Sequence, residues 1–316
     1  MSNELTIIIP AFNEVKTIQR NIKTIMAQLS DDGLAASYLI VDDGSRDDTW
    51  GELTRLAAEH SSVSCLRLSR NYGKEAAIFA GLAEVPTPLC LVMDSDLQHP
   101  PRYIKEMLAI MRETGADVVE GVKLSRGRET LKYKLVAKFF YRAFHWLCGI
   151  NLDGASDFKL FNRKAMGALK EFREGTVFFR GLVHWAGFKH ETLAFHVDNR
   201  EGDKSRFSTW RLIRFALMAT LSHSSQPLLL PFALAAVFWV GGILLGGIAL
   251  YGYFTGIAIS GFTTVILLLL IQGALILFSL GIIGLYLARI YDEAKRRPRF
   301  FVMEKMIRHD APSGQT

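Results

Sequence analysis

Two aspartates separated by a single residue, Asp94 and Asp96, directly follow an apolar run that is typical of a buried strand. In an extended turn, carboxylates two residues apart can face the same ion. Hard divalent cations such as Mg²⁺ and Mn²⁺ prefer oxygen ligands and commonly bridge to substrate phosphates. The pair therefore predicts a metal site that handles a phosphorylated substrate. The alternative is a polar strand end that binds nothing.

Polar segments also follow two other strand-like runs. Residues 10–14 read Pro-Ala-Phe-Asn-Glu after one run, and residues 42–45 read Asp-Asp-Gly-Ser after another. Ligands of open α/β sheets bind outside the carboxyl ends of the strands. We therefore expect both segments to lie beside Asp94 and Asp96 at one edge of a sheet.

The elements that position these residues alternate regularly between strand and helix. The predicted strands are 5–9, 38–41, 63–68, 89–93 and 117–121, and the predicted helices are 14–29, 48–59, 74–84 and 102–114. Short β-branched or apolar runs predict buried strands, and a repeat of three to four residues predicts helices packed on them. This alternation predicts a doubly wound α/β fold.

The C-terminal third has the composition of a membrane anchor. No Asp, Glu, Lys or Arg occurs between Arg214 and Arg289. That gap accommodates two spanning helices of about 20 residues or more, which we predict at 228–254 and 262–287. Basic residues flank both ends, so the positive-inside rule predicts that both flanks, the catalytic domain and both termini are cytoplasmic. The N-terminus lacks the features of a signal peptide, which agrees with a multi-pass protein of the inner (cell) membrane.

Two further segments, 130–148 and 207–223, combine basic and aromatic residues at helical spacing. In the first, Lys134, Lys138 and Arg142 are four residues apart. Such helices suit a membrane interface; the alternative is a helix packed on the sheet with a solvated basic edge. The formal net charge of +6 then favours an anionic membrane surface and phosphorylated substrates as partners, and no nucleic acid. The three cysteines show no metal-binding spacing and predict free thiols.

Several of these segments together resemble a known family. They are Ile-Ile-Pro-Ala-Phe-Asn-Glu at 8–14, Val-Asp-Asp-Gly-Ser-Arg-Asp-Asp-Thr at 41–49, Arg-Asn-Tyr-Gly-Lys at 70–74, Met-Asp-Ser-Asp-Leu-Gln-His-Pro-Pro at 93–101, Ser-Asp-Phe-Lys-Leu at 156–160 and Arg-Glu-Gly-Asp-Lys-Ser at 200–205. In this order they are similar to the GT-A glycosyltransferases of family 2, and within it to the polyprenyl-phosphate branch, which includes bactoprenol glucosyltransferases and dolichol-phosphate mannose synthases.

The resemblance implies roles for the matched residues. The base and ribose of a nucleotide sugar would contact Pro10, Phe12, Glu14 and Asp42. The metal ion and diphosphate would lie among Asp94, Ser95, Asp96 and Gln98, with Asp96 as a direct ligand and Lys123 near the phosphates. Arg200 and Lys204 would neutralise phosphates, although a solvated loop beside the membrane is an alternative for these two. Ser205 would bind the phosphate or the acceptor beside them. Further cations at the expected interface, Arg126, Arg128 and Lys138, would attract the anionic acceptor headgroup.

Asp157 corresponds to the family's usual candidate for a catalytic base. The acceptor, however, would be a phosphate monoester with a second pKa of about 6, which is already largely ionised at neutral pH. The alternative is that Asp157 orients the acceptor, or an Arg or Lys that holds it.

The sequence thus predicts a GT-A domain over 1–225, a two-helix anchor over 226–290 and a basic tail over 291–316. The implied enzyme is an inverting, metal-dependent hexosyltransferase that uses Mg²⁺ or Mn²⁺. It would move one sugar, with UDP-glucose preferred, onto a polyprenyl phosphate such as undecaprenyl phosphate, for cell-envelope glycan or lipopolysaccharide modification. GDP-mannose and UDP-linked amino sugars are alternative donors. A processive polysaccharide synthase and a non-catalytic membrane scaffold are the rival functions, and a homo-oligomer is possible.

Overall fold

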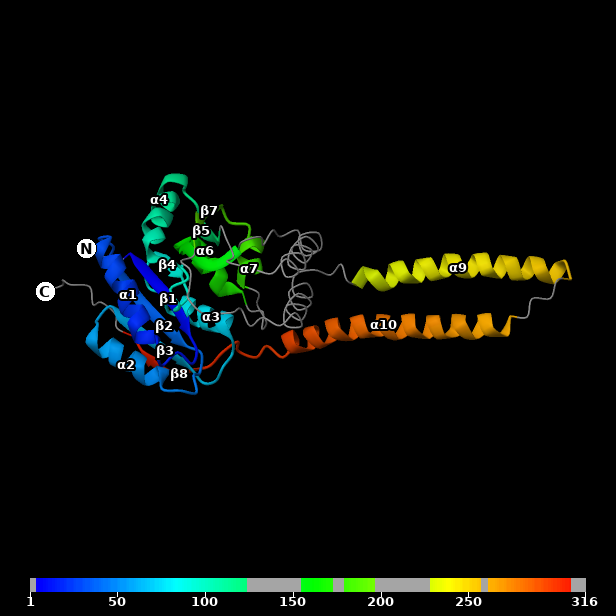
Figure 1. The fold of residues 1–316 in the computed structure, drawn as a ribbon, viewed down its shortest axis with the longest axis horizontal. Coiled ribbons are helices and arrows are strands. Elements are labelled where there is room, and N and C mark those ends of the chain that lie inside the picture. Colours follow the sequence, from blue (N-terminus) through cyan, green and yellow to red (C-terminus); the bar gives the residue numbers. More distant parts are fainter. Residues whose placement is uncertain (1–3, 124–154, 173–178, 197–227, 257–260, 308–316) are drawn as a thin grey trace. The chain divides into compact units, whose positions relative to one another are not determined.

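The structure, a computed structural model, describes residues 4–123, 155–172, 179–196, 228–256 and 261–307 (Figure 1). It contains two compact units. The first comprises Met1–Ser208 together with Pro298–Thr316, and the second comprises Thr209–Arg297. The predicted interfacial helices at 130–148 and 207–223 lie outside the described residues.

The first unit is built on one eight-stranded sheet with the order β7-β5-β6-β4-β1-β2-β3-β8. The strands are β1 (Leu5–Ala11), β2 (Ala36–Asp42), β3 (Val63–Leu68), β4 (Leu89–Val92), β5 (Val118–Lys123), β6 (Ala155–Asn162), β7 (His190–Phe195) and β8 (Val302–Met306). β1 pairs in parallel with both β2 and β4, and β5 pairs in parallel with β7. β6 is antiparallel to β4 and β5, and β8 is antiparallel to β3. The sheet is therefore mixed.

Helices cover both faces of the sheet (Figure 1). One apolar core joins it to α1 (Ile18–Asp31), α2 (Thr49–Glu59) and α4 (Ile104–Thr114), which follows the short 3₁₀ turn η1 (Pro101–Tyr103). A second core joins the opposite face to α3 (Lys74–Glu84), α6 (Arg163–Glu171) and α7 (Phe179–Trp185). Ile7 and Ile9 face the first core and Ile8 faces the second, which explains why the β1 sequence is apolar without alternation. The doubly wound α/β class predicted from the sequence is confirmed.

Three strands of this sheet, β6, β7 and β8, were not expected from the sequence. β6 follows residues 124–154 along the chain and carries a lysine, Lys159, at its centre. β8 lies within the segment that we assigned to a basic tail. Its Glu304 accepts a hydrogen bond from Trp50 Nε1 at 3.0 Å and pairs with Arg67 at 3.0 Å. The segment after the apolar region therefore closes one edge of the sheet.

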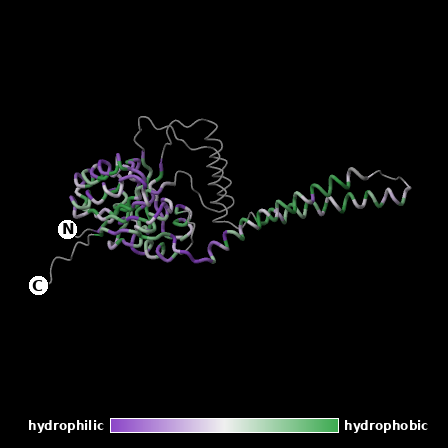
Figure 2. The backbone as a smooth tube through the Cα atoms, turned by 90° about the horizontal axis from the view of Figure 1, so that it is seen from below, coloured by the Kyte–Doolittle hydropathy of each residue, from purple (hydrophilic) through white to green (hydrophobic). Residues whose placement is uncertain are grey.

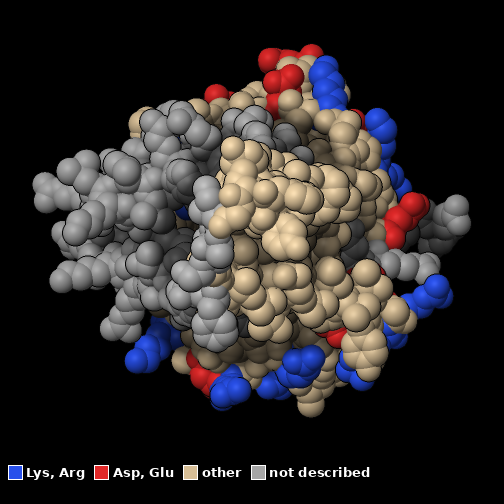
Figure 3. Space-filling view, turned by 90° about the vertical axis from the view of Figure 1, so that its right-hand side faces the viewer, with Lys and Arg blue, Asp and Glu red and all other residues tan. Residues whose placement is uncertain are grey.

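The second unit contains two long helices, α9 (Leu229–Phe254) and α10 (Phe262–Ala294), that run side by side (Figures 1 and 2). At 1.5 Å per residue, their 26 and 33 residues extend about 39 and about 50 Å, more than a hydrocarbon core of about 30 Å. Their apolar windows are not buried within the protein, and the end of the helix pair that faces the viewer in Figure 3 shows no Lys, Arg, Asp or Glu. Both helices are long and apolar enough to cross a membrane.

Gly44, in the loop after β2, provides a test of the close packing at this edge of the sheet. Its φ is +64°, and a Cβ atom there would lie 2.3 Å from the backbone carbon of Arg70. Gly33 has a similar φ of +71° with open space around it. We expect Gly33→Ala to lower the free energy of unfolding by about 1 kcal/mol, and Gly44→Ala to lower it by at least about 3 kcal/mol, because a backbone clash adds to the strain of φ. Denaturant unfolding of the full chain in detergent micelles measures the difference, and equal losses would contradict this packing.

Candidate functional site

A cavity of about 320 Å³ opens where β1, β2 and β4 end. Its lining combines carboxylates, a lysine, amide and hydroxyl groups and one aromatic ring. The lining residues are Pro10, Ala11, Phe12, Glu14, Asp43, Asn71, Gly73, Lys74, Asp94, Ser95 and Asp96. The three parallel strands end at the same edge, so loops from distant parts of the sequence meet there.

Hydrogen bonds hold the turn that carries Asp94 and Asp96. The buried Asn21 donates from Nδ2 to the carbonyl oxygen of Ser95 at 2.9 Å. Ser95 Oγ donates to Glu14 Oε1 at 2.8 Å. The Gln98 amide donates to Asp96 Oδ1 at 3.0 Å. These contacts tie the turn to α1 and to the segment after β1, so both aspartates have a fixed backbone.

His99 fixes the backbone of Asp94. Its Nδ1 accepts the Asp94 N–H at 3.0 Å, and its ring stacks on Phe158 with the centroids 5.1 Å apart. The side chain is buried, and burial lowers the pKa of His99 to about 4. The imidazole is therefore neutral at pH 7, and its Nδ1 carries the lone pair that this hydrogen bond requires.

The antiparallel pairing of β6 brings Asp157 to the same edge. Val92 pairs with Lys159, so two residues farther on the register sets Asp94 opposite Asp157. Lys74 Nζ lies between them, 2.5 Å from Asp94 Oδ1 and 2.6 Å from Asp157 Oδ2. From α7, Arg180 binds Asp157 through two hydrogen bonds, Nε to Oδ1 at 2.7 Å and a terminal nitrogen to Oδ2 at 3.0 Å. Two cations thus hold both oxygens of Asp157.

The electrostatics follow from this pairing. Burial alone would raise the pKa of Asp157, but the two hydrogen bonds from Arg180 and the charge of Lys74 outweigh it and hold the pKa well below its usual range. Burial alone would lower the pKa of Lys74, but the negative charges of Asp94 and Asp157 outweigh it and raise the pKa. Asp157 and Lys74 are consequently both charged at neutral pH, and Asp157 is a weak proton acceptor.

The structure brings several of the predicted site residues together. Pro10, Phe12, Glu14 and Ser95 line the cavity with Asp94 and Asp96. Asp42, which was predicted to contact the nucleotide, does not line the cavity. It is fully buried, its Oδ1 accepts the Ser45 amide at 2.9 Å, and its Oδ2 lies 3.5 Å from Arg67 Nε. Its neighbour Asp43 lines the cavity instead.

Gln98 and Lys123 contact each other next to the turn, with Lys123 Nζ 3.3 Å from Gln98 Oε1. Neither residue lines the cavity. The remaining predicted residues, which were assigned to phosphate and acceptor binding, lie outside the described residues; they are Arg126, Arg128, Lys138, Arg200, Lys204 and Ser205.

Sequence reasoning missed four residues of this site: Asp43, Lys74, His99 and Arg180. The first three lie within the segments that carried the family resemblance, but the sequence analysis assigned no role to them. Asp43 accepts the backbone amides of Tyr72 at 2.7 Å and Gly73 at 2.8 Å, and so holds the loop that leads to Lys74. Arg180 had no local signal, because its role depends on the packing of α7 against β6.

With this geometry established, the chain can be compared with known proteins. Residues 6–169, about half of the chain, match the family described as Glycosyl transferase family 2. The chain belongs to glycosyl transferase family 2. It is 34% identical over 312 residues to the Bacillus subtilis (strain 168) glycosyltransferase CsbB, with 96% of this chain and 92% of the relative covered. It is 27% identical to the bactoprenol glucosyl transferase of Shigella phage SfX, with 96% and 99% covered.

A solved structure supports the fold of this family 2 glycosyltransferase. Glucosyl-3-phosphoglycerate synthase from Mycobacterium tuberculosis, crystallised with Mg²⁺ and uridine diphosphate, superposes with a TM-score of 0.52 at 18% identity. The match covers 71% of this chain and 80% of that one. At this identity the likeness concerns the fold alone, and it supports the GT-A architecture.

Glu75, next to Lys74 on α3, gives the site a measurable pH dependence. Its Oε1 accepts the Phe179 amide at 3.0 Å, and burial raises its pKa from 4.5 to about 7. The folded protein therefore keeps this proton up to about pH 7, whereas the unfolded chain releases it near pH 4.5. The stability contributed by protonation is complete below pH 4.5 and is lost as the pH rises to 7.

We expect Glu75→Gln to remove this pH dependence. Near pH 4.5 the variant and the wild type should have similar stability. At pH 8 the variant should be more stable by up to about 3 kcal/mol, since 2.5 pKa units (7 minus 4.5) correspond to about 1.4 kcal/mol each. Unfolding midpoints measured across this pH range test the prediction, and a difference that does not change with pH would contradict it.

Proposed function

We propose that this family 2 glycosyltransferase transfers one sugar from a nucleotide sugar, preferably UDP-glucose, to a polyprenyl phosphate at the cytoplasmic face of the inner membrane. The observation that carries the proposal is the alternation of charge at the cavity edge, where Lys74 lies between Asp94 and Asp157 and Arg180 holds Asp157 from the other side. A site that brings two phosphorylated substrates together needs fixed charges of both signs.

The donor side of the cavity suits a nucleoside diphosphate and a divalent cation. Asp94 and Asp96 present carboxylate oxygens to one cavity, and Asp94 Oδ1 is buried with Lys74 as its charged neighbour. Mg²⁺ and Mn²⁺ favour such oxygen donors together with substrate phosphates, so the residues fit the ion. When bound, the ion supplies positive charge to the diphosphate leaving group. Pro10, Phe12 and Glu14 then form the wall available to the nucleoside.

Two observations support a lipid acceptor. The relative from phage SfX is named for bactoprenol, a polyprenyl carrier, and it aligns over nearly its whole length. The helices α9 and α10 would anchor the enzyme in the bilayer that holds such a lipid.

An oxygen of the lipid phosphate would attack the anomeric carbon, the bond from that carbon to the diphosphate would break, and the nucleoside diphosphate would leave. Inversion at the anomeric carbon follows from this single displacement.

In this mechanism Asp157 organises charge and does not take up a proton. Its two oxygens already accept hydrogen bonds from Arg180 and Lys74, and its pKa is held well below the usual range. The acceptor phosphate is mostly ionised above its second pKa of about 6. Asp157 would therefore hold Arg180 and Lys74 where their positive charges face the phosphates of the two substrates.

GDP-mannose and UDP-linked amino sugars remain alternative donors, because no described side chain singles out one base or one sugar. The predicted roles of Arg126, Arg128, Lys138, Arg200, Lys204 and Ser205 in binding phosphate or acceptor are part of the same proposal. A scaffold without activity would leave this charged cavity without a role, whereas a processive synthase would use it for the same donor and would differ in its product.

The full-length enzyme in detergent micelles should form polyprenyl-phosphate glucose from UDP-glucose and undecaprenyl phosphate only when Mg²⁺ or Mn²⁺ is present. Asp96→Asn should reduce the rate by at least about 100-fold, because it removes a charge that holds the ion. Asp48→Asn, a change in an exposed residue outside the cavity lining, is the matched control and should retain the rate. Chromatography of the lipid product measures both.

A long polymer as product would support the synthase. Wild-type protein that transfers no sugar from UDP-glucose, GDP-mannose or a UDP-amino sugar, although it is folded and metal-loaded, would contradict the proposal.

The role of Asp157 is tested by the pH dependence of the rate. We expect wild type and Asp157→Asn to share one rise near pH 6, which reflects ionisation of the acceptor phosphate, with the variant slower at every pH. If wild type shows a further carboxylate ionisation that the variant lacks, Asp157 is a base and the charge-organising role is wrong.

A further inference from the structure

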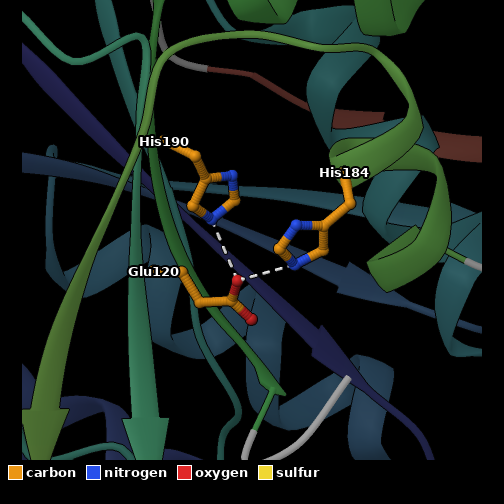
Figure 4. Close-up of side chains that lie close together, drawn as sticks. All are labelled: Glu120, His184 and His190. Carbon is orange, nitrogen blue, oxygen red and sulfur yellow. Dashed lines mark hydrogen bonds and ion pairs between the residues drawn. The ribbon is translucent and has the colours of Figure 1, made fainter. Parts of the chain in front are cut away.

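A second cluster of chemically active side chains lies outside the cavity lining, on the face of the sheet that also carries Asp157. Glu120 from β5, His190 from β7 and His184 from α7 converge there (Figure 4). Both imidazole Nε2 atoms approach the same carboxylate oxygen, Glu120 Oε2, at 3.1 Å from His184 and 2.9 Å from His190. The two rings are nearly parallel, with centroids 4.5 Å apart.

The backbone fixes this convergence. Glu120 pairs with Thr192 across the parallel β5–β7 ladder, so His190, two residues before Thr192, points to the same face of the sheet as Glu120. His184 lies on α7, four residues after Arg180, and α7 packs on that face. All three ligands come from regular elements, two strands and one helix, and such elements position a binding site more precisely than loops do.

The contacts around Glu120 leave one oxygen for a ligand. Its Oε1 accepts the Ser156 amide at 3.2 Å and is in close contact with the buried ammonium of Lys159. Its Oε2 faces the two imidazoles. Outer contacts of this kind orient the carboxylates that bind metal ions. His184 and His190 are 26% and 17% exposed, whereas Glu120 is buried, so solvent reaches the imidazole side.

We propose that Glu120, His184 and His190 bind a divalent transition metal ion, with Zn²⁺ as the best match. The three ligand atoms all lie within 4.8 Å of one another, so small side-chain movements would bring them to the usual Zn–N and Zn–O distances of about 2.0–2.2 Å. Two imidazoles and one carboxylate form a known set of three zinc ligands, with water in the fourth position.

This site differs in chemistry from the one at Asp94 and Asp96. Imidazole nitrogen suits Zn²⁺ and related ions, whereas sites made only of carboxylates and phosphates suit Mg²⁺ and Mn²⁺. A bound ion would join β5, β7 and α7 at one point. Since Arg180 lies one helical turn before His184, the ion would also fix the helix that carries the arginine bound to Asp157.

The competing possibility is that the three side chains only hydrogen-bond to one another. Lys159 already balances the charge of Glu120, and each histidine can donate from Nε2 to Oε2 without an ion. The two possibilities differ in one measurable property, which is the affinity of the protein for Zn²⁺.

The test is a calorimetric titration of Zn²⁺ into the full chain, purified in detergent micelles and first stripped with a chelator. We expect one site in the wild type that is unchanged in the Asp94→Asn/Asp96→Asn double variant. His184→Gln and His190→Gln should each weaken it by at least about 10- to 100-fold, the loss that removal of even an outer contact produces. The control is His60→Gln, which should bind like wild type. His60 lies outside the cluster and contacts Glu59 instead.

Thermal unfolding of the same proteins separates binding from misfolding. Zn²⁺ should raise the unfolding midpoint of the wild type and of His60→Gln but not that of His184→Gln, because a ligand that binds only the folded state stabilises it. If the wild type binds no Zn²⁺, or if a folded His184→Gln variant binds it as tightly as the wild type, the cluster is a hydrogen-bonded group only and the proposal is wrong.

Discussion

The arrangement of the candidate site depends on a single interaction, the double hydrogen bond between Arg180 and Asp157. A carboxylate that is nine-tenths buried is costly unless it is paired. At 11% side-chain exposure, Asp157 is paired, among the described residues, with Arg180 and Lys74. Removing Arg180 or Lys74 would leave part of the negative charge of Asp157 uncompensated beside Asp94. The pairing therefore constrains β6, α3 and α7 together, and it explains why these elements meet at the end of β4.

The antiparallel strand β6 makes this interaction possible. A parallel strand in the same position would direct its carboxyl end, and not its beginning, toward the cavity. Because β6 runs against β4 and β5, Asp157 near its start reaches the edge where Asp94 follows β4. Phe158 and Leu160 turn into one core, whereas Asp157, Lys159 and Phe161 face the other side. The strand thus supplies polar groups to one face and packing to the other.

Local patterns in the sequence predicted the elements that depend on local chemistry. Apolar runs identified β1 to β5, and the absence of charge identified α9 and α10. The polar segments after β1 and β4 were correctly expected at one edge. Patterns could not predict β6, whose central Lys159 contradicts a buried strand until Glu120 is known to pair with it. They also could not distinguish Asp42 from Asp43, because both are buried but Asp42 faces Arg67 whereas Asp43 lines the cavity. Arg180 and β8 depend on contacts between segments far apart in the sequence.

Lys159 and Asp157 are two residues apart on β6 and therefore share a face, which connects the two clusters described above. α7 lies over this face and contributes a residue to each, with Arg180 on Asp157 and His184 near Glu120. These residues are four apart, so they lie on the same side of the helix. The pKa of Glu120 is lowered despite its burial, because His184, His190 and Lys159 all favour its charged form. A seven-residue helix has little stability of its own. Its position therefore depends on these two polar contacts and on its apolar side, so a change in charge at Glu120 is transmitted through α7 to Arg180 and hence to the carboxylate of Asp157.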